Sequence, residues 1–232
     1  MKIGIFTDSH YSSQEITCGK RYNSKSLEKI RDAYMYFEES GCDLAICLGD
    51  LIDKENNHEK EMENLGRVAE VISKSSIPTV CLMGNHDAFA LSEEEFYTIL
   101  GKNCKPRTLC MDNKNFLFVD ACYFKNGKHY QPGDSDWTDT FYPKEEEFAQ
   151  LLAGLNEDSY VFMHQNIDHA ISQDHRLFNA DKMCRLIEDS RVVKAVYQGH
   201  YHPGKYSESG NVQYVTFPAM CEGDGRWYVV EI

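Results

Sequence analysis

Short apolar segments recur along the chain, and helical patterns separate many of them. Eight segments have the length and apolar character of strands: residues 2–6, 43–48, 78–83, 116–120, 160–164, 192–198, 212–217 and 227–232. Five stretches have helical patterns: residues 25–39, 59–75, 92–100, 143–155 and 179–190. Strands that are apolar on both faces need cover on both sides, so this alternation predicts an α/β fold in which helices cover the sheets.

The length of the chain fits one folding unit of this class. It has 232 residues, and α/β folds of this size are commonly built as one unit. No internal repeat, low-complexity tract or linker rich in proline and glycine interrupts it. We therefore expect a single domain over residues 1–232.

The net charge limits the partners that the chain can have. Its formal value is −13, so the surface as a whole repels long nucleic acids and anionic membranes. A small anion can still bind where a metal ion neutralises its charge locally. We expect a small ligand, no long nucleic acid and no membrane partner.

The cysteines and the start of the chain favour a cytoplasmic location. There are nine cysteines, an odd number, without CxxC spacing and in several cases inside apolar runs, as expected of reduced, buried thiols. Residues 2–6 are already strand-like, and no apolar run approaches membrane-spanning length.

Polar motifs follow five of the predicted strands at the point where each strand ends. They are TDSH after residues 2–6, GDLID after 43–48, GNHD after 78–83, HQN at the end of 160–164 and GHYH after 192–198. Each motif alone is most simply a turn or a helix cap. In α/β folds, however, loops at the carboxyl ends of strands converge on ligands, so five such loops together predict a site.

The five motifs bring together carboxylate, amide and imidazole groups and no lysine or arginine. The candidate metal ligands are Asp8, His10, Asp50, Asn85, His164, His200 and His202. Crowded carboxylates without cationic side chains need metal ions, and nitrogen and oxygen ligands without thiolates favour manganese, with iron or zinc as alternatives. Seven ligands are more than one tetrahedrally coordinated ion binds. The pattern therefore predicts two divalent ions that share a carboxylate, an arrangement that clamps a phosphoryl group for in-line attack.

The order of the motifs carries a family resemblance. D-x-H, G-D-x-x-D, G-N-H-D, a later histidine and G-H-x-H occur between residues 8 and 202, and in this order the chain resembles the calcineurin-like metallophosphoesterases. The resemblance implies a four-layer α-β-β-α sandwich of two mixed sheets flanked by helices. It also implies that Asp8, His10 and His202 hold one metal, that Asn85, His164 and His200 hold the other, and that Asp50 bridges them.

Three neighbouring polar residues are candidates for supporting roles. His86 follows a ligand and is expected to stabilise charge on the substrate or to protonate the leaving oxygen. Asp87 is expected to orient His86 and raise its pKa. Asp53 is expected to accept a hydrogen bond from a ligand histidine.

Substrate contacts are predicted from two aromatic side chains, Tyr11 and Trp137. Tyr11 begins a polar insert with Lys20 and Arg21 that either faces the pocket or is a solvated loop. Trp137 lies in the aromatic segment 120–143, which either forms a lid on which a nucleobase stacks or packs as a small satellite core. The histidines outside the motifs, at 58, 129, 169 and 175, are expected to be solvated or to cap helices.

These features favour a phosphohydrolase that cleaves phosphodiester or phosphoanhydride bonds of small, nucleotide-type substrates by attack of a metal-activated water. The order and spacing of the motifs are similar to the cyclic-nucleotide phosphodiesterase and ADP-ribose/CDP-alcohol diphosphatase branches. One alternative is a phosphomonoesterase of the same fold. Another is a non-catalytic metal-binding scaffold for protein partners, against which His86 and the full ligand set argue. A nuclease would need a basic surface, and a lipid-A-pathway diphosphatase would usually carry arginine at position 86.

Overall fold

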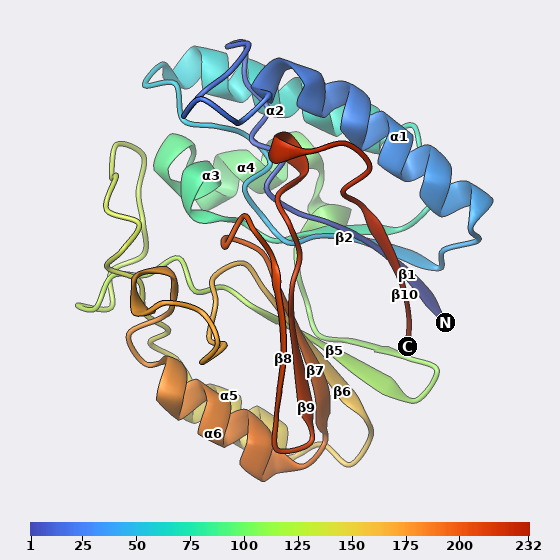
Figure 1. Cartoon of the computed structure of the whole chain (residues 1–232), viewed down its shortest axis with the longest axis vertical. Helices are drawn as coiled ribbons and strands as arrows, with labels where there is room; N and C mark the ends of the chain where they lie inside the picture. Colours follow the sequence, from blue (N-terminus) through green and yellow to red (C-terminus); the bar gives the residue numbers. More distant parts are fainter.

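Two mixed β-sheets face each other in the computed structural model, which describes all of residues 1–232 (Figure 1). The four-stranded sheet has the order β10-β1-β2-β3, and the six-stranded sheet has the order β4-β5-β6-β7-β9-β8. The first sheet contains β1 (Lys2–Phe6), β2 (Leu44–Cys47), β3 (Thr79–Cys81) and β10 (Tyr228–Glu231). The second contains β4 (Leu109–Met111), β5 (Lys114–Val119), β6 (Ser159–Met163), β7 (Val193–Gln198), β8 (Lys205–Ser209) and β9 (Val212–Thr216).

Helices cover the outer face of each sheet (Figure 1). The four-stranded sheet is covered by α1 (Ser26–Glu39), α2 (His58–Ile72), α3 (Asn85–Ala90) and α4 (Glu93–Leu100). The six-stranded sheet is covered by α5 (Glu145–Ala153) and α6 (Ala180–Ser190). Four 3₁₀ turns complete the chain: η1 (Asn23–Lys25), η2 (Lys102–Cys104), η3 (Gln173–His175) and η4 (Met220–Glu222). The predicted four-layer sandwich of two mixed sheets is confirmed.

Alternation along the strands divides the apolar side chains between the layers. In β1, Ile5 points into the space between the sheets and Phe6 points toward the helices. Across that space the second sheet presents Phe162 and Tyr197, whose rings stack with centroids 5.2 Å apart. Because both faces of the central strands are buried, these strands are apolar throughout, which is why the sequence marks them clearly.

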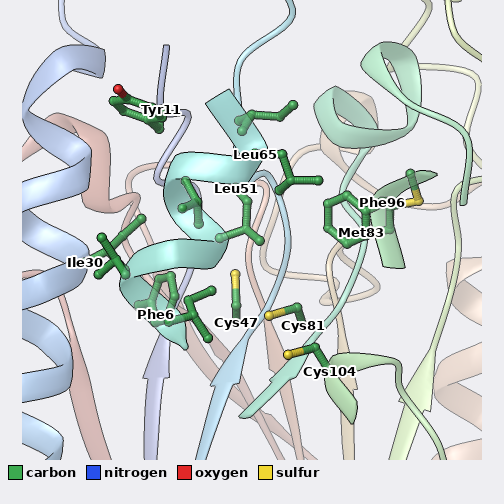
Figure 2. Close-up of a cluster of buried hydrophobic side chains, with 14 of the residues drawn as sticks. Phe6, Tyr11, Ile30, Cys47, Leu51, Leu65, Cys81, Met83, Phe96 and Cys104 are labelled. Carbon is green, nitrogen blue, oxygen red and sulfur yellow. The ribbon is translucent and has the colours of Figure 1, made fainter. Parts of the chain in front are cut away.

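The helix-facing layer of the first sheet is shown in Figure 2. Ile30 from α1, Leu65 from α2 and Phe96 from α4 pack there against strand side chains that include the thiols of Cys47 and Cys81. All nine cysteines are unpaired, and six of them are buried. None of the helices combines the length and the apolar composition that a membrane crossing requires.

The predicted helices and strands are confirmed to within three residues at each end. Three elements were not predicted. β4 has only three residues, β8 is a polar edge strand, and α3 begins inside the GNHD motif, where residues 84–87 look like a turn.

A stability test follows from the packing of α1 on the first sheet. A Cβ added to Gly4 in β1 would lie only 2.5 Å from the ring of Phe37, so Gly4→Ala should destabilise the protein by about 1–3 kcal/mol through overpacking. Gly66 in α2 has no atom within 4 Å of an added Cβ, so Gly66→Ala should stabilise it by about 0.5–1 kcal/mol. Urea unfolding of both variants in the presence of a chelator measures these changes. A Gly4→Ala variant as stable as the unmodified protein would show that α1 is free to move away from β1.

Candidate metal centre

The five polar motifs lie at the same end of the two sheets. They follow the carboxyl ends of β1, β2 and β3 in the first sheet and of β6 and β7 in the second. Six of the seven predicted ligands are buried, with at most 8% of any of them exposed, and the side chain of the seventh, His202, is 11% exposed. The structure therefore brings the predicted set together between the loops of both sheets.

One group of ligand atoms gathers around the end of β1. The Nε2 atom of His10 lies 3.2 Å from Nε2 of His202 and 3.7 Å from Oδ1 of Asp8. The Nε2 atom of His202 lies 3.4 Å from the same Asp8 oxygen.

A second group gathers around the end of β6. The Nε2 atom of His164 lies 3.2 Å from Oδ1 of Asn85 and 3.2 Å from Oδ2 of Asp50. Ligand atoms of Asp50, His164 and His200 lie within 4.8 Å of one another. The Asp50 Oδ2 atom also lies 3.5 Å from Nε2 of His10, so this oxygen faces both groups.

These separations fit metal coordination. Ligand atoms about 2.0–2.2 Å from a common ion are roughly 3.0–3.5 Å apart at octahedral or tetrahedral angles. Oδ1 of Asp8 and Nε2 of His200 are buried and have no hydrogen-bond partner in the protein, although buried polar atoms are normally paired. Imidazole, carboxylate and amide donors suit divalent transition metals. The residues present therefore fit two ions with Asp50 between them.

Each carboxylate uses one oxygen for the protein and leaves the other for the centre. Oδ2 of Asp8 accepts hydrogen bonds from the Thr7 hydroxyl at 2.6 Å and from the backbone N–H of His200 at 3.0 Å. Oδ1 of Asp50 accepts from the backbone N–H of His86 at 2.8 Å. These bonds fix the direction of the remaining oxygen of each side chain.

The outer nitrogens of two ligand histidines also have partners. Nδ1 of His164 lies 3.0 Å from the carbonyl oxygen of Leu48, and Nδ1 of His202 lies 2.5 Å from Oε1 of Glu222. Nδ1 of His10 lies 3.6 Å from Oδ1 of Asp53, beyond hydrogen-bond distance, so the predicted hydrogen bond from a ligand histidine to Asp53 stays a prediction. Such partners orient the ring so that Nε2 faces the ion. Glu222 was not predicted, because no motif surrounds it.

The backbone is strained where it presents these ligands. Four of the seven ligands have φ in the left-handed region, an unusual conformation for residues other than glycine: Asp8 (53°), His10 (44°), Asp50 (53°) and His200 (65°). Gly84 is extended, with φ of −95° and ψ of −179°, so it is not needed for a sharp turn. It is needed for close approach, because an added Cβ would lie 2.2 Å from Oδ1 of Asp50.

The electrostatics of the metal-free centre follow from buried carboxylates beside buried imidazoles. Burial alone would raise the pKa of Asp50, but His164, His86 and His10 hold it well below its usual range. Burial alone would lower the pKa of His10 and of His164, but Asp50 and other carboxylates raise both to about 9. Burial lowers the pKa of His200 to about 3. Without metal, protons on His10 and His164 balance the carboxylates, so metal binding has to displace protons.

The predicted role of Asp87 is wrong, and Asp53 takes its place. Nδ1 of His86 lies 2.6 Å from Oδ1 of Asp53. The Asp87 carboxylate instead accepts hydrogen bonds from the backbone N–H groups of Gly84, Leu51 and Ile52 at 3.0–3.2 Å. The pKa of His86 is lowered, because burial outweighs the opposing effect of Asp50 and Asp53.

The prediction for Tyr11 is also wrong. Tyr11 is 5% exposed and belongs to the buried cluster under α1 and α2, where Figure 2 shows it. Its backbone pairs with Ile52, which turns the side chain away from the metal centre. Tyr11 therefore does not line the pocket.

A cavity of about 340 Å³ opens above the metal ligands. Residues outside the motifs that line it are Cys18, Lys20, Arg21, Trp137, His175, Pro203 and Glu222. Lys20 and Arg21 are cationic side chains at this cavity, but each is paired with a carboxylate, Lys20 with Glu222 at 3.1 Å and Arg21 with Asp53 at 3.6 Å. His175 also faces the cavity, contrary to the expectation of a solvated or helix-capping residue. Its ring centroid lies 5.2 Å from that of Trp137.

The segment 120–143 combines the two alternatives that the sequence left open. Tyr130 is 1% exposed and packs against Phe89 and Phe124, with ring centroids 4.8 and 4.5 Å away, as in a satellite core. Trp137 is 37% exposed and reaches the cavity, where its ring centroid lies 5.7 Å from that of His200. Its contact with substrate stays a prediction.

Comparison with known proteins agrees with this geometry. The family model described as calcineurin-like phosphoesterase matches residues 1–204, a range that contains all seven predicted ligands. A probable cyclic nucleotide phosphodiesterase of Psychrobacter arcticus is 23% identical over 227 residues, which are 93% of this chain and 74% of that protein.

Solved structures share the fold at low sequence identity. The crystal structure of a dimetal phosphatase from Danio rerio has a TM-score of 0.83 and 15% identity, and the match covers 98% of this chain and 91% of that one. A Thermus thermophilus protein has a TM-score of 0.64 and 13% identity, with 96% and 91% coverage. At these identities the likeness establishes the fold alone.

Two substitutions test the assignment of the ligands. Asp50→Asn should reduce the content of both ions, because its Oδ2 atom faces both groups, whereas Asn85→Ala should reduce chiefly one. Elemental analysis after loading with manganese and removal of the excess measures the stoichiometry, with about two ions expected for the unmodified protein. A stoichiometry of one or less in the unmodified protein would contradict the assignment.

Proposed function

The chain belongs to the calcineurin-like phosphoesterase family, and from this premise we propose that it hydrolyses phosphodiester or phosphoanhydride bonds of small, nucleotide-type substrates. The observation that carries the proposal is the position of Asp50 Oδ2 between two groups of imidazole, amide and carboxylate atoms. This is the donor arrangement that a pair of divalent ions requires.

The residues divide into two binding positions and a shared one. Asp8, His10 and His202 would hold one ion, Asn85, His164 and His200 would hold the other, and Asp50 would contribute to both. Ions bound there supply Lewis-acid polarisation of the phosphoryl group and an activated water nucleophile. We favour manganese, with iron or zinc as alternatives.

His86 is the side chain placed to act on the leaving group. It lines the cavity with 22% of its side chain exposed, while its backbone N–H is held by Asp50 and its Nδ1 atom lies against Asp53. The Asp53 carboxylate at Nδ1 favours the imidazolium form, against the burial that lowers the pKa of His86, and leaves Nε2 for a substrate oxygen. His86 thereby donates a proton to the leaving oxygen or a hydrogen bond to the charge that develops on it.

The nucleotide-type substrate rests on three supports. The Psychrobacter arcticus relative is named a probable cyclic nucleotide phosphodiesterase. The cavity of about 340 Å³ suits a compact ligand, and two cationic side chains, Lys20 and Arg21, line it in a chain whose net charge is −13. Trp137 offers a ring for stacking, a contact worth about 1–3 kcal/mol per base in single-stranded nucleic-acid sites.

A phosphomonoesterase of the same fold is the second candidate. The open rim of the cavity does not exclude a monoester, and the fold likeness to a dimetal phosphatase does not separate the two reactions. A binding scaffold without turnover is disfavoured, because a scaffold has no need of His86 in the cavity beside the ligands.

Substitution of His86 tests the chemistry. His86→Ala should retain both ions and lower turnover by about 10²–10⁴-fold on esters with poor leaving groups, the usual size of general acid catalysis. The loss should be smaller with a nitrophenolate leaving group, which needs no proton. His169→Ala is the control, because His169 is half-exposed and does not line the cavity. Equal losses on both substrates would assign His86 a role in positioning or charge stabilisation.

Substitution of Trp137 tests the substrate class. We expect cyclic nucleotides or nucleotide diphosphate derivatives to be hydrolysed faster than phosphomonoesters under each metal. Trp137→Ala should raise KM for these substrates by about 5- to 150-fold, the equivalent of 1–3 kcal/mol, and leave KM for a nitrophenyl diester unchanged. Tyr206→Ala is the control, because Tyr206 is 56% exposed on β8 and lies outside the cavity. Faster turnover of phosphomonoesters than of every diester and diphosphate would favour the second candidate.

A further inference from the structure

A thiol that neither the motifs nor the family range includes lies against the metal centre. Cys221 in η4 is fully buried, and its Sγ atom lies within 4.8 Å of a ring nitrogen of His10 and of His202. The position is fixed by the backbone: the N–H of Cys221 donates to the carbonyl oxygen of Asp8 at 3.1 Å, and its own carbonyl accepts from the N–H of Tyr22 at 2.9 Å.

A second observation points to a cation at the same place. Oδ1 of Asp8 is buried without a hydrogen-bond partner and lies 3.7 Å from Nε2 of His10 and 3.4 Å from Nε2 of His202. The Asp8 oxygen and the Cys221 sulfur therefore both lie near ring nitrogens of His10 and His202. No lysine or arginine side chain is paired with that oxygen; its contacts are the two imidazoles.

The two groups of ligand atoms differ in whether a cysteine lies among them. Around His164 and His200 the donors are amide, imidazole and carboxylate, and the groups that could hold a metal there include no cysteine. Around His10 and His202 such a group includes Cys221. Sulfur is a softer ligand than carboxylate or amide oxygen, so the two positions differ in the metals that they favour.

We propose that Cys221 supplies a sulfur ligand to the ion held by Asp8, His10 and His202, and so makes the affinity of this position for softer metals such as zinc, iron or cobalt, relative to manganese, higher than at the other position. The inference rests on the proposed two-ion centre. On coordination the S–H bond of Cys221 is replaced by a sulfur–metal bond, the proton passes to solvent, and no oxidation state changes.

The distance is compatible with coordination. Nitrogen and sulfur ligands on opposite sides of one ion are about 4.4 Å apart, given bonds of about 2.1 Å to nitrogen and 2.3 Å to sulfur. The Cys221 sulfur is thus within coordination distance or a small side-chain movement from it. Burial raises the pKa of the Cys221 thiol well above its ordinary value.

Cobalt(II) gives a direct readout, because a sulfur–cobalt bond produces a charge-transfer absorption band that nitrogen and oxygen ligands do not. Metal-free protein titrated with cobalt(II) should develop this band as one equivalent fills the position. Cys221→Ser should still bind two ions but lack the band. Its zinc affinity at that position should fall about 10- to 100-fold relative to its manganese affinity, the range seen when support of a metal site is removed.

Cys18→Ser is the matched control, because Cys18 is the other cysteine that lines or adjoins the centre and is exposed at the rim of the cavity. This variant should keep the band. Persistence of the band in Cys221→Ser, or its loss in Cys18→Ser, would overturn the proposal.

Cobalt binding by the unmodified protein also tests the role of Cys221 without any variant. Binding of two cobalt ions without the band would overturn the role of Cys221 and leave the proposed function intact. Failure to bind cobalt, zinc or manganese at all would overturn both. If Cys221→Ser does not fold, Cys221→Ala and the unmodified protein provide the same comparison.

Discussion

The carboxylate of Asp50 links the two halves of the sandwich. One oxygen is held by the backbone N–H of His86 in α3, and the other faces His10 after β1 and His164 after β6. Elsewhere the sheets meet through apolar side chains, but at this end they meet through a polar layer. Buried carboxylates and imidazoles are tolerated there because they neutralise one another, by shared protons or by shared cations. The close approach of Gly84 and the left-handed ligands are both consequences of this layer.

Much of the fold and of the ligand set could be predicted from the sequence, and the reason is physical. Strands buried on both faces are apolar runs with clear ends, and parallel strands bring their carboxyl ends to one edge. The residue after each apolar run can therefore be placed at that edge of the sheet before any contact is known. This is why Asp8, Asp50 and His164, far apart in the chain, could be expected together. Short or polar edge strands such as β4 and β8 carry no such pattern.

The errors concern side-chain direction and long-range contacts. Asp87 is adjacent to His86 in sequence, but both lie in the first turn of α3, where neighbouring side chains point about 100° apart. The carboxylate of Asp87 therefore turns back to cap its own helix, and Asp53 from another loop meets the imidazole. Glu222 and Cys221 follow the last motif by about twenty residues, and only the return of the chain toward β1 places them at the centre. The periodicity of a helix or a strand is a local pattern, so it does not predict that a segment late in the chain will contact an early one.

The strand order has a consequence for the time at which this centre is assembled during synthesis. β10, the last strand, pairs antiparallel with β1, the first, and the carbonyl oxygens of Thr7 and Asp8 accept hydrogen bonds from residues 220 and 221. A ribosome delivers the chain from its amino end, so the loop after β1 is made first and receives residues 220 and 221 last. Its earlier neighbours include Gly49 and Asp50, whose carbonyl oxygens accept from the backbone N–H groups of Asp8 and His10. The nascent chain therefore gains its metal-binding geometry in a late step, after nearly every other contact is available.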